Sequence, residues 1–247
     1  MTADPGPADL VLAGGGVKGI GLAGAVVALA DAGYRLKRVS GTSAGAVVGA
    51  VVAAGSKAGW TGEQMRDAVF GIEYDKFLDP GPVERIPLFG PAFGVLRGSG
   101  LYRGDYAHAW IRDTLKDLGV STFGDLRTDD KDLPEERRYR LVVTVTDITR
   151  GLLVRLPWDY RSVYGLDPDE QSVADAVRAS MSIPFYFRPA TLTATSGLRS
   201  TLVDGGLLSN FPIDSLDRID TDQPRWPTFG VTVLPNLPAG NDKVLPP

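Results

Sequence analysis

Three glycine motifs in the sequence carry residues suited to acyl-transfer chemistry. The first, Gly41-Thr42-Ser43-Ala44-Gly45, matches the pattern G-x-S-x-G. In a sharp turn between a strand and a helix, this pattern projects the serine hydroxyl from the edge of a sheet, and the small flanking residues let the backbone fold tightly. The helix that follows directs its N-terminus at the site, which favours developing negative charge. We therefore predict that Ser43 is a nucleophile on a turn that needs Gly41 and Gly45.

The second motif, Gly14-Gly15-Gly16-Val17-Lys18-Gly19, follows a short apolar segment and precedes a helical one. Glycine N–H groups in such a loop can converge on a tetrahedral oxyanion, and removing one donor typically costs about 3–4 kcal/mol of transition-state stabilisation. We expect an oxyanion hole at Gly14, Gly15 and Gly16. Lys18 adds positive charge there or neutralises a neighbouring acid; a role as base is less consistent, because nothing in this loop deprotonates a lysine.

The same loop also matches the dinucleotide-binding pattern G-x-G-x-x-G. That pattern requires an acidic residue about 20 residues further on, at the end of the next strand, to bind the ribose hydroxyl. Segment 37–40 reads Lys-Arg-Val-Ser and holds no acid, although Arg38 could meet a ribose phosphate. An NADP-binding oxidoreductase therefore stays open as an alternative.

The third motif, Asp204-Gly205-Gly206, comes directly after the apolar strand expected at 201–203. An aspartate there can reach the sheet edge that carries Ser43, because a separation of 204 − 43 = 161 residues is no obstacle in a parallel sheet. On its own, Asp-Gly is also a common turn. We predict that Asp204 is the base and that Gly205 and Gly206 complete its motif.

A histidine base is hard to place. The chain has one histidine, His108, on the flank of an amphipathic helix expected at 106–118, and no histidine follows Asp204 as the order Ser, Asp, His would require. We expect His108 to be a residue at the edge of the core. A carboxylate with a pKa near 4 is a poor base for a hydroxyl, so a Ser43–Asp204 dyad depends on geometry, partial burial and a strong oxyanion hole. Such a site suits esters better than amides.

The elements that must position these residues follow from hydrophobic patterning. Strand, glycine turn and helix recur twice within the first 55 residues, which predicts a parallel α/β sheet with ligands at its carboxyl edge. The expected helices are 18–32, 44–54, 61–70, 106–118 and 173–180, and the expected strands are 9–13, 36–40, 139–146, 152–156, 201–203 and 229–234. Segment 71–104 has no clear period and is either a lid or a plain surface excursion. With no repeat or linker, we predict a single domain over 1–247.

Composition excludes several classes of function. The 247 residues include no Cys and one His, which excludes thiolate sites and multi-histidine metal centres. A net charge of −4 argues against a nucleic-acid partner, because phosphate contacts need clustered basic residues. The N-terminus lacks the features of a secretory signal, and the apolar stretch 10–30 is broken by glycines and Lys18. We expect a protein that is cytoplasmic or peripheral to a membrane.

The three motifs, in this order, resemble those of the patatin-like phospholipase family. Further matches extend the likeness over most of the chain: GLYRGD at 100–105, STFGDL at 121–126, VTD at 145–147, ASMSIP at 179–184, and Phe187, Pro189, Asn210 and Pro212. The resemblance implies a three-layer α/β/α fold with a mainly parallel central sheet. It also implies a serine–aspartate dyad, with Ser43 as nucleophile, Asp204 as base, and Gly15 and Gly16 as oxyanion donors.

The expected function is therefore a serine acyl hydrolase that cleaves carboxylic ester bonds of lipids, of the phospholipase A, lysophospholipase or lipid acyl hydrolase type. Ser43 forms an acyl-enzyme that water then hydrolyses. The expected partner is a lipid or phospholipid substrate at a membrane or micelle surface. No metal or cofactor is expected, because no loop rich in Asp and Glu resembles a calcium site. A non-catalytic lipid-binding relative is a third possibility, beside the oxidoreductase.

Overall fold

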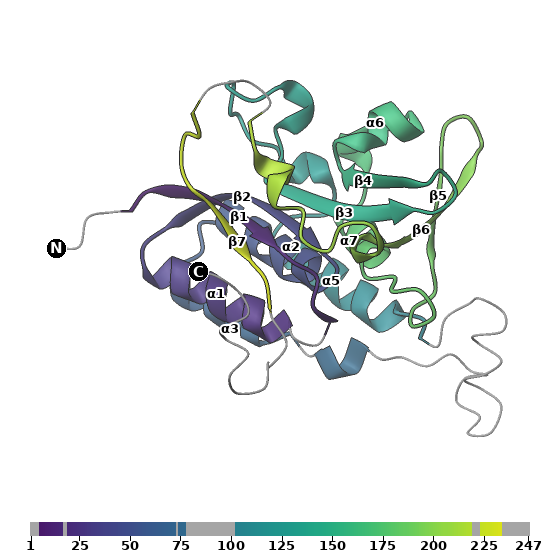
Figure 1. Cartoon of the computed structure of the whole chain (residues 1–247). Coiled ribbons are helices and arrows are strands. Elements are labelled where there is room, and N and C mark those ends of the chain that lie inside the picture. The colour runs from purple at the N-terminus through teal and green to yellow at the C-terminus, as the bar shows by residue number, and fades with distance from the viewer. Residues whose placement is uncertain (1–4, 17–18, 73, 78–101, 219–222, 234–247) are drawn as a thin grey trace, which may run out of the picture.

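The computed structural model describes residues 5–16, 19–72, 74–77, 102–218 and 223–233. Within these residues, seven strands form one sheet in the order β5-β6-β3-β2-β1-β7, with β4 also paired to β3 (Figure 1). The strands are β1 (Pro7–Leu12), β2 (Arg35–Thr42), β3 (Leu141–Asp147), β4 (Leu152–Leu156), β5 (Ala190–Thr193), β6 (Arg199–Asp204) and β7 (Thr228–Val231). The predicted α/β fold, a central sheet flanked by helices, is confirmed.

The sheet is mixed, because only part of it is parallel. Strands β7, β1, β2 and β3 pair in parallel, whereas β4 and β6 run antiparallel to β3, and β5 runs antiparallel to β6. Short connections explain two of the three antiparallel pairs, which differ from the mainly parallel sheet that we expected. Four residues, 148–151, join β3 to β4, and five residues, 194–198, join β5 to β6. Connections this short allow hairpins but not parallel crossovers.

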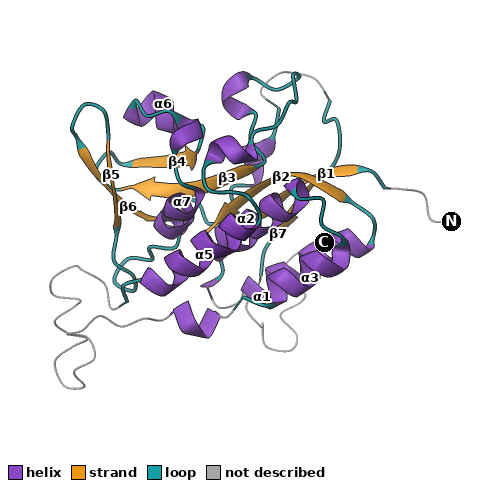
Figure 2. Cartoon of the chain, turned by 180° about the vertical axis from the view of Figure 1, so that it is seen from behind, coloured by secondary structure: helices purple, strands orange, loops and turns teal. Residues whose placement is uncertain are grey.

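Six described helices surround the sheet. They are α1 (Gly19–Asp31), α2 (Ala44–Lys57), α3 (Gly62–Phe70), α5 (Asp105–Asp117), α6 (Asp159–Tyr164) and α7 (Val173–Ser180). Seen from behind, α2, α5 and α7 lie across one face of the sheet (Figure 2). The expected helices were placed close to these bounds, but α6 and strand β5 were not anticipated, because each is too short to show a period.

Helix α2 is the most deeply buried of these helices. Residues 44–55 are all buried, and the helix contacts β2, β3, α1, α3, α5 and α7. A helix enclosed on every side must be apolar around its whole circumference, and Ala, Val and Gly meet that need while allowing close approach. The residue before this helix, Ser43, is therefore fixed by the protein core rather than by a surface loop.

Three strand ends converge beside Ser43. Strand β1 ends with Leu12 next to Gly41, and β2 ends with Thr42 next to Thr144. Strand β4 occupies one edge of β3 over 143–147. The other edge is shared: β2 pairs with residues 141–144, and β6 pairs with residues 145–147 from the opposite direction. Strands β2 and β6 therefore meet head to head on one edge of β3.

Among the described residues, no helix combines the length and apolar character that crossing a membrane requires.

Candidate active site

The backbone at Ser43 has a conformation that non-glycine residues rarely adopt. Ser43 is the residue before α2, with φ +54° and ψ −122°, and it is 6% exposed. Such conformations cost roughly 1–3 kcal/mol and persist only where the surrounding structure imposes them. The strained turn directs the chain from β2 into α2 within one residue, as the G-x-S-x-G pattern predicts.

The two glycines of the turn are required by backbone packing. A Cβ atom on Gly41 would lie 2.3 Å from the carbonyl oxygen of Gly45. A Cβ atom on Gly45 would lie 2.4 Å from the carbonyl oxygen of Leu12, at the end of β1. Both contacts are with backbone, which cannot move without shifting a buried strand or helix. Any side chain at either position therefore disrupts the turn.

We predict that Gly45→Ala destabilises the protein by about 1–3 kcal/mol, as overpacking in a rigid core does. The matched control is Gly24→Ala in α1, where an added Cβ meets nothing within 4 Å. Gly24→Ala should stabilise by about 0.5–1 kcal/mol, because alanine is the better residue in a helix interior. Urea unfolding of both variants measures the difference, and equal stabilities would show that backbone crowding does not restrict position 45.

The amide of Ser43 is anchored by a second serine. The Ser43 N–H donates to Ser180 Oγ at 2.8 Å, and the Ser180 hydroxyl donates to the carbonyl oxygen of Thr144 at 2.8 Å. Ser180 is fully buried at the end of α7. It therefore ties the turn to β3, the strand whose edge β2 and β6 share. Ser180 was included in the sequence analysis only within the family match at 179–184, because no local pattern indicates a function for it.

Asp204 lies at the end of β6 with its carboxylate buried. One oxygen, Oδ1, accepts the N–H of Gly206 at 2.7 Å, and the Asp204 N–H donates to the carbonyl of Ser182 at 2.9 Å. The other oxygen, Oδ2, is buried and accepts no hydrogen bond from the described residues. A Cβ atom on Gly205 would lie 2.4 Å from the carbonyl oxygen of Thr144, so this glycine is also required.

Burial raises the pKa of Asp204 above its ordinary value. The Ser43 hydroxyl and the Gly206 N–H lower the pKa, but by less than burial raises it. The Ser43 hydroxyl is thus close enough to stabilise the carboxylate, although the geometry falls short of a hydrogen bond to Oδ2. Ser43 and Asp204 line the same pocket, so the hydroxyl and the carboxylate are neighbours there.

The glycine loop after β1 is held against this pair by Asn210. The Gly14 N–H donates to the Asn210 carbonyl at 2.9 Å, and Asn210 Nδ2 donates to the Gly14 carbonyl at 3.2 Å. The amide of Gly14 is therefore already used, whereas no described residue accepts the amides of Gly15 and Gly16. Gly16 has φ +54°, a left-handed conformation that favours glycine. Lys18 lies outside the described residues.

One pocket of about 460 Å³ is shared by Ser43, Asp204 and the glycine loop. Its lining comprises Gly14, Gly15, Gly16, Ser43, Ile183, Pro184, Asp204, Gly206, Leu207 and Asn210. The structure therefore brings Ser43 and Asp204 together with Gly14, Gly15, Gly16 and Gly206, whereas Gly41, Gly45 and Gly205 are not part of the lining. Sequence reasoning did not assign Ile183, Leu207 or Asn210 to this pocket.

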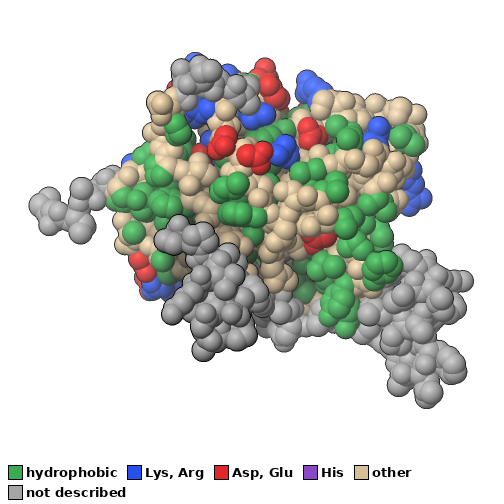
Figure 3. Space-filling view, viewed as in Figure 1, with side chains coloured by type: hydrophobic (Ala, Val, Ile, Leu, Met, Phe, Trp, Pro, Cys, Tyr) green, Lys and Arg blue, Asp and Glu red, His purple; other side chains and the backbone are tan. Residues whose placement is uncertain are grey.

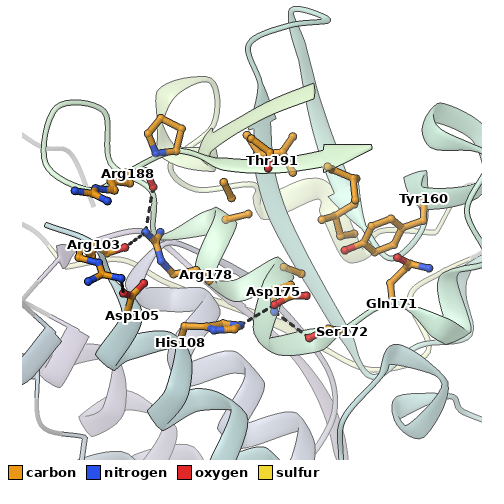
Figure 4. A pocket seen from close by; sticks show the side chains of 17 residues that line it. Arg103, Asp105, His108, Tyr160, Gln171, Ser172, Asp175, Arg178, Arg188 and Thr191 are labelled. Atoms are coloured by element: carbon orange, nitrogen blue, oxygen red, sulfur yellow. Dashed lines mark hydrogen bonds and ion pairs between the residues drawn. The ribbon is translucent and has the colours of Figure 1, made fainter. Parts of the chain in front are cut away.

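His108 lines a different pocket, also of about 460 Å³, between α5, α7 and β5 (Figure 4). Its Nε2 lies 2.6 Å from Asp175 Oδ1, and the two side chains point toward each other in Figure 4. In the same pocket, Arg178 donates to the carbonyls of Arg103 and Arg188. The chain's only histidine is thus engaged with Asp175 rather than with the groups around Ser43.

Arg38, the candidate for a ribose phosphate, is buried and paired. Its guanidinium forms an ion pair with Asp9 and donates to the carbonyl of Leu216 at 2.9 Å. Asp9 and Arg38 lie in the first halves of β1 and β2, whereas the glycine loop follows the end of β1. The arginine is therefore unsuited to binding a cofactor phosphate at that loop.

A comparison with known proteins identifies the family of the chain. A family model described as patatin-like phospholipase matches residues 10–217, which include Gly14, Ser43 and Asp204. The chain belongs to the patatin-like phospholipase family. Family membership supports a lipid hydrolase, and it gives the dinucleotide interpretation of the glycine loop no support.

Named relatives extend the match to most of this patatin-like chain. It is 38% identical over 231 residues to YqhO of Bacillus subtilis, an uncharacterized protein, covering 92% of this chain and 71% of that protein. It is 27% identical over 256 residues to MT2641 of Mycobacterium tuberculosis, an uncharacterized NTE family protein, of which it spans 36%. VipD from Legionella pneumophila shares the fold, with a TM-score of 0.51 and 23% identity over 87% of this chain and 48% of that chain.

Proposed function

We propose that this protein is a serine acyl hydrolase that cleaves carboxylic ester bonds of lipids through a Ser43–Asp204 dyad. The observation that carries the proposal is the meeting of β2 and β6 on one edge of β3. That meeting sets a strained serine beside a buried carboxylate in one pocket. Besides a nucleophile and a base, acyl transfer requires hydrogen-bond donors for the oxyanion, and the glycine loop supplies them.

The reaction begins when Ser43 Oγ attacks the ester carbonyl carbon as Asp204 Oδ2 takes the hydroxyl proton. The carbonyl oxygen becomes an oxyanion that the amides of Gly15 and Gly16 stabilise. Collapse of the tetrahedral intermediate breaks the ester bond, and the proton on Asp204 passes to the departing alcohol. Water then attacks the acyl-enzyme carbonyl carbon as Asp204 accepts one of its protons. Collapse of this second intermediate breaks the bond to Ser43 Oγ, the proton passes from Asp204 to Oγ, and the carboxylic acid leaves.

The environment of Asp204 suits this exchange of protons. Burial raises the pKa of the carboxyl, which makes the carboxylate a stronger base than a solvated aspartate. Oδ2 has a free acceptor site among the described residues, so the incoming proton displaces no existing hydrogen bond. The Gly206 N–H holds Oδ1 and fixes the plane of the carboxylate. Helix α2 adds the partial positive charge of its N-terminus at Ser43.

The pocket walls favour a substrate with an apolar acyl part. Ile183, Pro184 and Leu207 supply apolar surface directly beside Ser43 and Asp204. We therefore propose a phospholipid or lysophospholipid as substrate, consistent with the family. The direct test is incubation of purified protein with phosphatidylcholine and lysophosphatidylcholine, with mass-spectrometric detection of the products. Free fatty acid released at equal rates with and without the protein would refute the proposal.

A glycine substitution tests the oxyanion donors. Gly16→Ala forces alanine into φ +54°, where a side chain costs about 1–2 kcal/mol. We expect the loop to relieve this strain by rotating its amides, which lowers kcat about 10²-fold, close to the effect of losing one oxyanion donor. Gly59→Ala is the matched control, because Gly59 has φ +74° and equally open space but lies after α2.

Both variants should lose similar thermal stability, while only Gly16→Ala loses turnover. Equal activities of the two variants would exclude the loop from the reaction.

A further inference from the structure

Exposed apolar side chains lie in the two segments that border the Ser43 pocket. We define the rim patch as Ile183, Phe185, Tyr186, Leu207 and Leu208, whose exposed fractions range from 37% to 69%. In Figure 3, hydrophobic side chains gather at the lower right of the described surface, where Figure 1 draws the loop after α7. Ile183 and Leu207 also line the pocket itself. Apolar surface therefore continues from the outer face of the protein to the reacting groups.

The first segment of the rim patch, 183–187, is held rigidly. The N–H groups of Tyr186 and Phe187 both donate to the Ile183 carbonyl, at 3.0 and 2.9 Å. Tyr102 clamps the segment: its N–H donates to the Tyr186 carbonyl at 2.8 Å, and the two rings lie 5.0 Å apart. The exposed side chains are thus displayed on a fixed turn.

Neighbouring aromatic residues on this turn have opposite environments. Phe187 is 6% exposed and packs under the Arg178 guanidinium, whereas Phe185 is 69% exposed. Phe185 also has φ +67°, a conformation that bulky residues rarely adopt. The fold therefore accepts backbone strain at a residue whose ring gains little burial within the protein. Insertion of the Phe185 ring into the surface of a binding partner would account for both its exposure and its strained backbone.

We propose that the rim patch seats the protein on an uncharged or zwitterionic lipid surface, with Phe185 and Leu208 entering the acyl region. This proposal rests on the proposed function and names the physical form of its substrate. None of the five side chains is charged, and the chain carries a net charge of −4, so neither feature favours an anionic lipid surface. Tyr186 suits the headgroup level, where amphipathic aromatic side chains gather.

Lipid is the occupant that the position of the rim patch favours. Seating on a bilayer places the pocket opening against the acyl chains, so an ester can reach Ser43 without crossing water. A second copy of the chain on the same surface would instead cover the opening. Binding strength at a membrane scales with the apolar area inserted, so polar replacements at the tip should weaken it strongly.

The test compares vesicle binding with catalysis in separate assays. The double variant Phe185→Asn/Leu208→Gln changes two residues outside the pocket lining, and asparagine tolerates the left-handed backbone at 185. Binding to phosphatidylcholine vesicles is measured by flotation in a Ser43→Ala background, so that no lipid is consumed. The control is Leu198→Gln. This leucine is 46% exposed, against 55% for Leu208, and it lies just before β6, at the opposite end of that strand from Asp204.

We expect the double variant to bind phosphatidylcholine vesicles at least about tenfold more weakly than the parent, and Leu198→Gln to bind unchanged. With Ser43 present, the double variant should lose vesicle hydrolysis but retain turnover of a water-soluble short-chain ester. Undiminished vesicle binding by the double variant, or binding of the parent only to anionic vesicles, would overturn the proposal. The proposal would also be overturned if the parent were a dimer and the double variant a monomer that still bound vesicles as well as the parent.

Failure of the proposed function has a different signature. In that case the parent binds phosphatidylcholine vesicles through the rim patch, but neither the vesicles nor the short-chain ester is hydrolysed.

Discussion

Replacement of Ser43 by alanine is expected to lower kcat/KM on a medium-chain chromogenic ester by about 10⁴-fold or more. Losing the nucleophile of a covalent mechanism removes the acyl-enzyme route altogether, and comparable knockouts in serine hydrolases cost up to about 10⁶-fold. The oxyanion donors and the pocket would remain, so a small residual activity over water is expected. Steady-state rates with purified protein measure the effect.

The matched control is Ser196→Ala, at an exposed serine in the turn between β5 and β6. It removes the same hydroxyl from a site that has no contact with the pocket, and its activity should equal that of the unmodified protein. Stability of Ser43→Ala should stay close to normal, because the anchoring hydrogen bond uses the backbone N–H rather than the side chain. If Ser43→Ala and Ser196→Ala turned over ester equally fast, Ser43 would not be the nucleophile.

Asp204→Asn is expected to lower kcat about 10²–10⁴-fold, the usual contribution of a general base. Asparagine is nearly the same size and can still accept the Gly206 N–H, so the pocket geometry should persist. The unmodified protein should also lose activity toward acid pH as the Asp204 carboxylate is protonated. Because burial raises the pKa of Asp204, this loss should begin at higher pH than for an ordinary carboxyl near 4.

Asp204→Asn should also increase the thermal stability of the protein at neutral pH. The folded-state pKa of Asp204 is raised, so the folded protein favours the protonated form, and that stabilising contribution is lost as pH rises through the folded pKa. At pH 7 the buried carboxylate therefore destabilises the fold, and asparagine removes the charge. We expect a higher Tm for Asp204→Asn at pH 7 and a shrinking difference as the pH approaches 4.

A pair of scans by calorimetry, at pH 7 and near pH 4, checks the sign. A variant that is both inactive and less stable at pH 7 would assign Asp204 a structural role and would count against its role as a base.

The candidate site residues could be named from the sequence because their structural requirements are local. Ser43 needs a turn so tight that only glycine fits at 41 and 45, and that need is visible as G-x-S-x-G. The motifs at 14–19 and 204–206 are local in the same way, since each combines a strand end with glycines. Helix α2 was predictable for a related reason: its small apolar residues on every side indicate a helix enclosed in the core.

The route by which Asp204 reaches Ser43 was not predictable from local pattern. We expected both residues at the carboxyl edge of parallel strands, but β6 is antiparallel to β3 and meets β2 head to head. Strand direction depends on which distant segments pair, and the short apolar segment at 201–203 carries no signal of direction. The single-domain prediction for 1–247 stays a prediction.

The supporting contacts were hidden for the same reason. Ser180 lies 137 residues from Ser43, and Asn210 lies 196 residues from Gly14, so neither contact leaves a spacing that a sequence shows. The hydrogen bond from Gly14 to Asn210 also narrows the expected oxyanion donors to Gly15 and Gly16. Much of the irregular segment expected at 71–104, residues 78–101, lies outside the described part of the chain.

Covalent labelling tests most directly whether Ser43 is an activated nucleophile. The purified protein is treated with a fluorophosphonate and digested, and the modified peptide is sequenced by mass spectrometry. We predict a single adduct on Ser43, formed at least about 10²-fold more slowly in Asp204→Asn, because the base is then missing. An adduct on another residue, or equal labelling rates with and without the Asp204 carboxylate, would contradict the proposed dyad.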